Sequence, residues 1–555
     1  MSDVLKRAII GQWRHTARGA LLASGHQAGE AMVPVVIGVV IDRAVATGDG
    51  GALVRWVAVL AVVFAVLSFS YRFSFRAAER ASEQAAHGLR IELTERVLHA
   101  RGGAEDGRLP GELVNIASGD AKRVGAVHLA LTAGVAALGG LVAGGFALLW
   151  VSVPLGLVVL LGIPPVLLLA HLLGRPLERR SGTEQERAAH ASGVAADLIA
   201  GLRVLKGLGA ESTAVGRYRR TSRDSLAATL RAARAQAWHD GGMLALTGVF
   251  IAVVALVGGR LAASGDITVG QLVAAVGLAQ FLLTPLSILA WANGELAQAR
   301  ASAARISAVL ATPPAVADGT GDLPPQVRGE VRLRNVSYGA LNDLSLVAAP
   351  GEMLGVVAEP AVATALLRVL GRAADPDAGV IELDGLPFSE LDPAAIRAAV
   401  LVAEHDADLF EGTLLANVGA AAAPDGIERA MSAASADEVA DTLPQGPETT
   451  LTERGRSLSG GQRQRVALAR ALAVAAPVLV LHDPTTAVDA VTEARIAAGL
   501  RESRTGLTTI IVATSPALLA AADRVVHVAD GTAVAEGTHA DLVHGDDAYR
   551  ATVLA

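Results

Sequence analysis

The chain contains 555 residues, 52% of them hydrophobic, and carries a formal net charge of −7. This charge is small for the length and gives no electrostatic reason to expect nucleic acid as a partner. There is no cysteine, which excludes disulfide bonds, thiolate metal sites and cysteine nucleophiles. The high apolar share instead indicates that much of the chain lies in lipid.

The first 310 residues have the pattern of a membrane domain. A helix needs about 20 mainly apolar residues to cross the hydrocarbon layer, and the sequence offers six such stretches. Lys and Arg gather in the two long links at residues 76–123 and 174–237, which places these links and both termini in the cytoplasm. The predicted spans cover residues 20–41, 54–75, 126–150, 153–174, 241–262 and 268–292.

Residues 311–329 are rich in Pro, Gly and Asp, which is typical of a linker between separately packed units. From residue 330 to residue 555, strand-like runs such as MLGVVA, PVLVLH and TTIIVA alternate with helical segments. This alternation predicts a mostly parallel sheet covered by helices. A helix-rich insertion is predicted at about residues 405–470.

One motif in this α/β domain has the chemistry of a phosphate-binding helix start. The segment LSGGQRQR runs from Leu458 to Arg465, upstream of the segment VLVLHDPTTAVD. The backbone N–H groups of Gly460 and Gly461 begin a helix and can meet a phosphate end-on, and glycine permits the close approach. The hydroxyl of Ser459 adds a further hydrogen-bonding group. These residues predict one wall of a nucleotide site.

The other wall, where a phosphate-binding loop is expected, lacks the residues that such a loop needs. Residues 355–370 read GVVAEPAVATALLRVL, without lysine and without a run of glycines. The lysine position falls on Thr364 when counted forward from Gly351 and on Ala363 when counted back from Asp375. Charge-assisted hydrogen bonds contribute about 1.5 to 3 kcal/mol each, so the loss of several weakens triphosphate binding by orders of magnitude.

The predicted spans, the two long links, the linker, LSGGQ and TTAVD together resemble one half of an ATP-binding-cassette exporter, over nearly the full chain. The resemblance implies an α-helical six-span transmembrane domain at residues 1–310, the linker at 311–329, and an α/β nucleotide-binding domain with a helical subdomain at 330–555. In this family each ATP site forms between two cassettes, with the phosphate loop of one facing the signature segment of the other. By resemblance, the residues that face an ATP held mainly by a partner are Ser459, Gly460, Gly461, Gln462 and Asp489.

The same resemblance identifies departures at the positions that hold metal and activate water. The metal-binding aspartate is replaced by His482, and the catalytic glutamate by Asp483, whose side chain is one methylene shorter. The metal-sensing glutamine position aligns with His405 and the switch histidine with Thr514. Together with the altered phosphate loop, these changes imply a degenerate nucleotide site that holds no metal. A transition-metal site at His405, His482 and Asp483 is a less favoured alternative.

The leading hypothesis is a subunit of a heterodimeric ATP-driven transporter, with export as the expected direction. Its partner is expected to be a homologous half-transporter with an intact phosphate loop and catalytic glutamate, which holds most of the ATP and Mg2+. The chain alone is then not expected to hydrolyse ATP. The alternative is a non-enzymatic passive carrier or regulatory membrane subunit, which the complete LSGGQRQR segment disfavours. Both hypotheses make the chain an integral protein of the cell (inner or plasma) membrane with a cytoplasmic nucleotide-binding domain.

Two further features concern transport itself. His26 and Glu30 lie four residues apart on one face of the first predicted span, and ionisable groups at membrane depth usually face a cavity or a partner. They are candidates for the transport path, although they can equally hydrogen-bond across helices without touching substrate. Residues 111–124 and 195–207 interrupt long helical runs near glycines and resemble segments that couple the cassette to the spans. The sequence does not specify the substrate.

Overall fold

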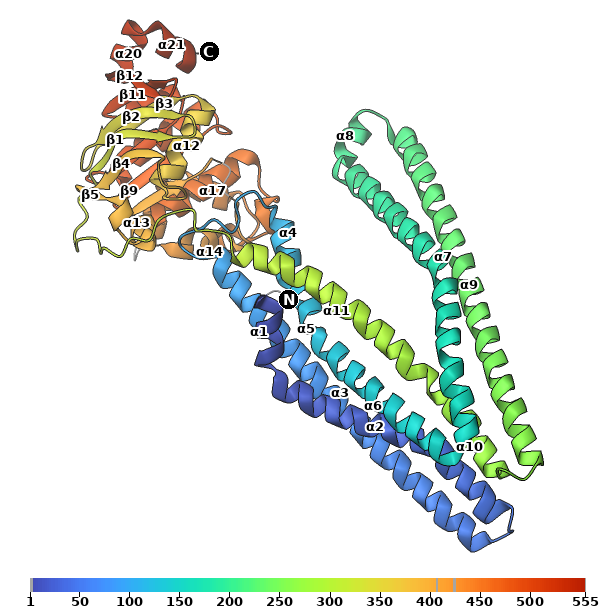
Figure 1. The fold of residues 1–555 in the computed structure, drawn as a ribbon. Helices are drawn as coiled ribbons and strands as arrows, with labels where there is room; N and C mark the ends of the chain where they lie inside the picture. The colour runs from blue at the N-terminus through green and yellow to red at the C-terminus, as the bar shows by residue number, and fades with distance from the viewer. Residues whose placement is uncertain (1–2, 406–407, 423–425, 555) are drawn as a thin grey trace. The chain divides into compact units, whose positions relative to one another are not determined.

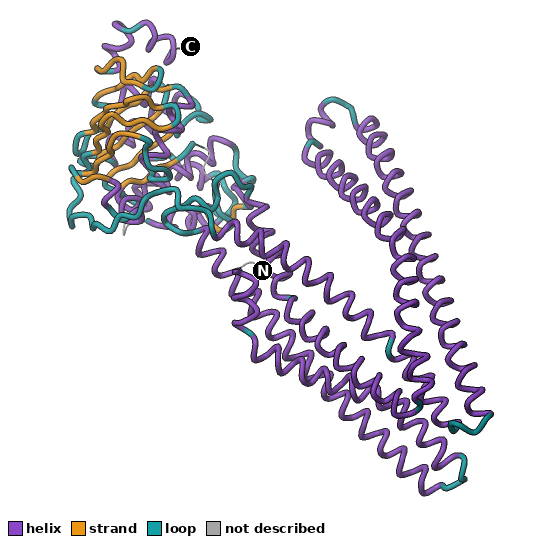
Figure 2. Tube along the Cα trace, in the orientation of Figure 1, coloured by secondary structure: helices purple, strands orange, loops and turns teal. Residues whose placement is uncertain are grey.

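The computed structural model describes residues 3–405, 408–422 and 426–554. An all-helical part is followed by a part that combines helices with β-sheets (Figures 1 and 2). This agrees with the expected fold class, a helical membrane domain followed by an α/β domain. The contacts divide the chain into two compact units, Met1–Leu93 with Gly111–Ala308 and Thr94–Pro110 with Val309–Ala555.

The short segment Thr94–Pro110 belongs to the second unit, although it directly follows a long helix of the first. The guanidinium of Arg96 donates hydrogen bonds to the carbonyl oxygens of Gly102 at 2.9 Å and Thr312 at 2.7 Å. The N–H of Ala315 donates to the carbonyl oxygen of Arg101 at 2.9 Å. Part of the first cytoplasmic link is therefore held against the residues of the predicted linker.

The first unit is built from long helices. Among the described helices, five are long and apolar enough to cross a bilayer. The helix at the first predicted span, α2, is not one of these five, because His26, Gln27 and Glu30 lower its mean hydropathy. The helices are α1 (Asp3–Gly11), α2 (Trp13–Val40), η1 (Ile41–Val45), α3 (Gly50–Val97), α4 (Pro110–Asn115), η2 (Ile116–Asp120), α5 (Ala121–Gly125), α6 (Val127–Val151), α7 (Val153–Ala200), α8 (Leu202–Gly207), α9 (Glu211–Ala263), α10 (Val269–Phe281) and α11 (Leu283–Leu310).

Glycines let α2 approach its neighbours closely. A Cβ at Gly38 would lie 2.4 Å from the carbonyl oxygen of Gly270 on α10, and a Cβ at Gly29 would lie 3.2 Å from the Cβ of Leu67 on α3. On α6, a Cβ at Gly140 would lie 3.0 Å from Oε1 of Gln27. Small residues at such crossings are the usual means by which membrane helices pack. They place α2 in contact with α3, α6 and α10.

Both predicted coupling segments are interrupted helices. Residues 111–124 cover most of α4, η2 and α5, and residues 195–207 cover the end of α7 and the short helix α8. The long helices α7 and α9 run side by side, and α8 connects them at their tip (Figure 1). The glycine that separates α7 from α8 is Gly201.

The second unit contains a six-stranded sheet in the order β12-β11-β3-β10-β9-β6 and a four-stranded antiparallel sheet in the order β2-β1-β4-β5. In the larger sheet all neighbours are parallel except β12, as the alternation of strands and helices predicts. The strands are β1 (Val331–Tyr338), β2 (Leu341–Ala348), β3 (Met353–Ala358), β4 (Ala378–Leu383), β5 (Leu386–Pro387), β6 (Val400–Ala403), β7 (Gly412–Thr413), β8 (Thr450–Leu451), β9 (Val478–His482), β10 (Thr508–Val512), β11 (Arg524–Ala529) and β12 (Thr532–Gly537).

Among the described residues, three apolar clusters pack on the larger sheet, and the two larger ones cover strands β3, β9 and β10. One contains α12 and α13 with side chains of β3, β9 and β10, and the other contains α14 to α18 with other side chains of the same strands. The second core matches the helix-rich insertion expected at about residues 405–470. The longer helices of this unit are α12 (Pro360–Leu370), α13 (Pro393–Ala399), α14 (Leu414–Val418), α15 (Gly426–Ala433), α16 (Ala436–Asp441), α17 (Gly460–Ala473), α18 (Ala490–Ser503), α19 (Pro516–Ala521), α20 (His539–Gly545) and α21 (Asp547–Val553).

Candidate functional site

The signature segment LSGGQRQR forms the start of helix α17. Ser459 is its N-cap: the hydroxyl oxygen accepts a hydrogen bond from the N–H of Gln462 at 3.3 Å, and the Ser459 N–H donates to Oε1 of Gln462 at 2.9 Å. This reciprocal capping box fixes the first helical turn. The N–H groups of Gly460 and Gly461 lie in that first turn, where a helix has no internal partners for its donors. The side chain of Gln462 is used for capping.

The segment that follows strand β9 passes close to this helix start. A Cβ at Gly461 would lie 2.5 Å from the carbonyl oxygen of Ala487, whereas a Cβ at Gly460 would lie 3.4 Å from the Cβ of Ala487. Gln464 fastens the same segment, since its Nε2 donates to the hydroxyl of Thr486 at 2.6 Å and its Oε1 accepts from the N–H of Ala487 at 2.8 Å. The signature turn and the TTAVD segment therefore form one packed surface.

Asp489 ends the TTAVD segment and caps helix α18. Its Oδ1 accepts hydrogen bonds from the N–H groups of Val491 at 3.1 Å and Thr492 at 3.0 Å. The bond from the Thr492 N–H is the main cause that lowers the pKa of the Asp489 carboxyl. The side chain is exposed, so the oxygen that does not cap the helix can face a partner molecule.

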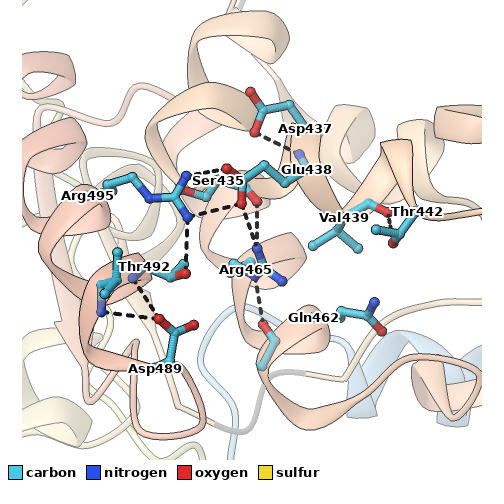
Figure 3. A network of polar contacts seen from close by, with 12 residues as sticks. Ser435, Asp437, Glu438, Val439, Thr442, Gln462, Arg465, Asp489, Thr492 and Arg495 are labelled. Atoms are coloured by element: carbon cyan, nitrogen blue, oxygen red, sulfur yellow. Dashed lines mark hydrogen bonds and ion pairs between the residues drawn. The ribbon is translucent and has the colours of Figure 1, made fainter.

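Glu438 on α16 connects the signature helix with the helix that Asp489 caps (Figure 3). Both its carboxylate oxygens bond the guanidinium of Arg495 on α18, and Nη1 of Arg465 on α17 lies 3.5 Å from Oε2. Arg465 also donates to the carbonyl oxygen of Ser435 at 3.1 Å. Arg495 is the main cause that lowers the pKa of Glu438. Three helices thus meet at one carboxylate.

At the predicted phosphate-loop position, strand and helix follow each other almost directly. Strand β3 ends at Ala358 and helix α12 begins at Pro360, so only Glu359 separates them. Val362 and Ala363 are both buried in the apolar core below the sheet. No loop of backbone N–H groups is therefore present between these two elements to surround a triphosphate.

The chemistry of this strand-to-helix junction is also unfavourable for phosphate. Glu359 is exposed at the N-cap of α12, where its carboxylate is attracted by the helix dipole and repels another anion. Pro360 has no N–H to donate. Thr364 is uncharged and its hydroxyl donates back to the carbonyl oxygen of Pro360 at 2.8 Å. The residues present here do not fit a triphosphate with Mg2+.

The residues predicted at the metal and water positions lie together at the ends of β6 and β9. The ring centroids of His405 and His482 are 5.1 Å apart, and Nε2 of His482 lies 3.7 Å from Oδ2 of Asp483. Burial is the main cause that lowers the pKa of His482, with Asp483 acting in the opposite direction. Among the described residues, no group of three or more His, Cys, Asp or Glu side chains is placed to hold a metal ion. The transition-metal alternative therefore has no support in the part of the chain that is described.

Thr514 lies just beyond the end of strand β10 and is exposed. Because Val512 pairs with His482 in the parallel ladder, Thr514 belongs to the same edge of the sheet as His482. The strands β3, β10 and β9 are neighbours in the sheet, and helix α12 follows β3. These elements carry or precede the predicted positions Thr364, His482, Asp483 and Thr514.

Two residues of this region were missed by sequence reasoning. Gln464 lies within the quoted LSGGQRQR segment, and its position two residues after Gln462 is the only sequence signal for it. Glu438 has no motif that marks it, because its partners Arg465 and Arg495 are 27 and 57 residues away in the chain. Only the packing of three helices reveals its position.

Comparison with known proteins agrees with this architecture. Residues 19–286 match the family model of the ABC transporter transmembrane region, and residues 341–486 match the ABC transporter model. The chain is 30% identical over 414 residues to an ATP-dependent lipid A-core flippase of Thiobacillus denitrificans. The aligned region covers 72% of this chain and 71% of the flippase. The chain belongs to the ABC transporter family.

Other similarities cover more of this ABC transporter. It is 34% identical over 531 residues to a multidrug efflux ATP-binding/permease protein of Mycobacterium tuberculosis. The aligned region covers 94% of this chain but only 44% of that relative. The chain thus spans less than half the length of that protein. A solved structure of a bacterial Atm1-family ABC exporter with ATP bound has a TM-score of 0.75 and covers 100% of this chain and 98% of its own, at 23% identity. At this identity the likeness concerns the fold.

In the membrane part of this ABC transporter, the structure brings His26 and Glu30 together. Nε2 of His26 lies 3.8 Å from Oε2 of Glu30, and Nδ1 of His26 lies 2.8 Å from the carbonyl oxygen of Leu67 on α3. His26 therefore forms a hydrogen bond to a neighbouring helix, which was one of the two alternatives that the sequence allowed. Glu30 remains a candidate for the transport path, since its side chain is 45% exposed.

Proposed function

We propose that the chain is one half of a heterodimeric ATP-driven exporter and supplies the signature segment to a catalytic site held by its partner. The observation that carries this proposal is the contrast within one cassette. The start of α17 keeps a capped, glycine-lined turn that can face a phosphate, whereas the junction of β3 and α12 lacks a loop and a lysine and begins its helix with a proline.

The partner is a homologous half-transporter that contributes the phosphate loop, the metal ligand and the catalytic glutamate, and therefore holds most of the ATP and Mg2+. Ser459, Gly460 and Gly461 provide hydrogen-bond donors opposite that site. Asp489, which caps helix α18, is assigned to the same surface. The site formed around Ala358 and Thr364 does not turn over, because no residue there activates water or holds the metal.

An exposed apolar tip supports the presence of a partner. Around helix α8, the side chains of Ile199, Val204 and Leu208 are 73%, 64% and 74% exposed. Apolar residues gathered at one exposed tip usually mark an interface. We assign this tip to the cassette of the partner subunit, which covers it in the assembled transporter.

The direction and the compartment follow from the relatives. The names of two similar proteins describe multidrug efflux and an ATP-dependent lipid A-core flippase. We therefore propose that this protein exports an amphiphile from a plasma membrane and keeps its cassette in the cytoplasm. A non-enzymatic homodimer that acts as a passive carrier or regulatory subunit is the competing proposal, and it gives no reason for the intact signature turn.

The deciding experiment is to purify the full chain with and without its co-purifying partner and to measure ATP hydrolysis. We expect background rates for the chain alone and turnover for the pair. The partner, identified by mass spectrometry, is expected to carry an intact phosphate loop and a glutamate at the position of Asp483. Robust hydrolysis by the chain alone would overturn the proposal, and recovery of only a homodimer without turnover would favour the regulatory alternative.

A further inference from the structure

A carboxylate lies deep in the membrane part of this chain without a fixed cationic partner. Glu30 precedes the end of α2 at Val40 by ten residues, which corresponds to about 15 Å along a helix. This is about half of the roughly 30 Å hydrocarbon layer. In the described chain the only ion pair of Glu30 is with His26, four residues earlier on the same helix. A charged carboxylate at this depth is unfavourable unless a cation accompanies it.

The hydrogen bonds of His26 decide what this histidine can offer to Glu30. A carbonyl oxygen only accepts hydrogen bonds, so Nδ1 of His26 must carry the hydrogen that it shares with Leu67 at 2.8 Å. The nitrogen that faces Glu30 is then Nε2, at 3.8 Å. In a neutral ring Nε2 carries a lone pair and gives no attraction to a carboxylate. A charged Glu30 therefore gains no attraction from a neutral His26, and a cation from outside can supply it.

The surrounding helices add few groups that compete for this role. Helix α10 contains no ionisable residue, and α6 contains only His128, whose Nδ1 lies 2.7 Å from the hydroxyl of Thr16. On α3, Arg72 and Arg76 come one and five positions after Tyr71, and both residues are exposed. Neither arginine forms an ion pair with Glu30 in the described structure.

Aromatic rings extend from the pair along α3. The ring of Tyr71 lies 5.1 Å from that of His26, and Phe75 stacks on Tyr71 with centroids 6.2 Å apart. Tyr71 is 55% and Phe75 48% exposed, so both rings offer a free face. Aromatic faces attract cations, most strongly where water is excluded. His26 contacts both Glu30 and Tyr71, so it connects the carboxylate with the row of rings on α3. A carboxylate and aromatic rings together have the chemistry of a site for an organic cation with apolar substituents.

We propose that Glu30, Tyr71 and Phe75 bind an amphiphilic organic cation, with His26 as a positioning residue. The proposal rests on the proposed function as an exporter and names the substrate class. His26, which is held by its hydrogen bond to the carbonyl oxygen of Leu67, lies between Glu30 and Tyr71.

The test compares two ions of the same shape and opposite charge, tetraphenylphosphonium and tetraphenylborate, by equilibrium dialysis against the full chain in nanodiscs without ATP. We expect the chain to bind the phosphonium more tightly than the borate. Glu30→Gln is expected to weaken phosphonium binding at least tenfold and to leave borate binding unchanged. Equal binding of both ions, or unchanged phosphonium binding by Glu30→Gln, would overturn the proposal.

Control variants separate this site from general charge effects. Glu83→Gln, on the same helix as Tyr71 and paired with Arg90, is expected to bind the phosphonium like the parent chain. Tyr71→Leu is expected to weaken binding several-fold and keeps the test valid if Glu30→Gln does not fold. None of these measurements uses ATP, so their failure leaves the heterodimer proposal to be judged by hydrolysis alone.

Discussion

Within the nucleotide-binding part of this protein, the start of helix α17 and the start of helix α12 differ in their polar contacts and burial. At the start of α17, polar side chains are retained and bonded to one another, with Ser459, Gln462 and Gln464 all engaged. At the start of α12, Val362 and Ala363 are buried in the apolar core and the hydroxyl of Thr364 turns back on its own helix. The start of α17 thus keeps glycines and a capping hydroxyl at its first turn, whereas the first turn of α12 carries a proline and two side chains that pack into the core.

The largest effect is expected from the signature end. Ser459→Arg places a long cation where the capping hydroxyl and the phosphate-facing turn lie, and we expect it to reduce ATPase activity of the assembled transporter at least a hundredfold. Thr364→Ala is the matched substitution at the other end and is expected to change activity by less than about twofold, as exposed sites away from a functional feature usually tolerate substitution. Steady-state hydrolysis by the two complexes measures the contrast, and equal losses would contradict it.

A second, smaller effect concerns the packing that holds the signature turn. Gly461→Ala brings a Cβ to 2.5 Å from the carbonyl oxygen of Ala487, and we expect a loss of stability of about 1 to 3 kcal/mol from such overpacking. Gly460→Ala, whose Cβ meets Ala487 only at 3.4 Å, is expected to lower the melting temperature less. Thermal unfolding of the two variants compares them directly, and a larger loss for Gly460→Ala would refute the packing argument.

The carboxylate between three helices is expected to matter moderately. Glu438→Gln removes the charge that Arg465 and Arg495 share, so the signature helix and α18 lose their common anchor. We expect a several-fold drop in ATPase activity of the complex with little change in melting temperature, because the group is half exposed and its ion pairs are screened. Glu502→Gln, an exposed carboxylate on α18, serves as the control. A drop of the same size in the control would remove the special role of Glu438.

The smallest expected effect is a dependence of stability on pH at His482, beside the end of strand β9. Burial lowers the pKa of His482 below its ordinary 6.5, so the unfolded chain binds a proton more readily than the folded one. Stability is therefore expected to fall as pH drops through 6.5 and to level off below the folded pKa. His482→Asn should reduce this slope, measured as melting temperature between about pH 5 and pH 8. An unchanged slope would show that other groups cause it.

Much of the site was predictable because its signals are local. Hydropathy marked the long helices, and the LSGGQ and TTAVD segments marked two helix starts, which the structure caps with Ser459 and Asp489. Their shared role at an ATP site stays a prediction from the family resemblance. The first predicted span is the exception, because polar residues in α2 lower its mean hydropathy, the property by which membrane spans are recognised. The altered phosphate-loop region was predictable only in part. The sequence showed that the lysine is missing, and the structure adds that only Glu359 separates strand β3 from helix α12.

What the sequence by itself determined is the order of spans and strands and the identity of one helix start, because these depend on periodicity and on neighbouring residues. The tertiary structure alone decided that Glu438 joins two helices, that Gln464 fastens Ala487 and that His26 bonds Leu67. It also decided that the segment Thr94–Pro110 packs with the linker region of the second unit. These contacts join residues far apart in the chain, and no local pattern records which distant side chain will lie within hydrogen-bonding distance.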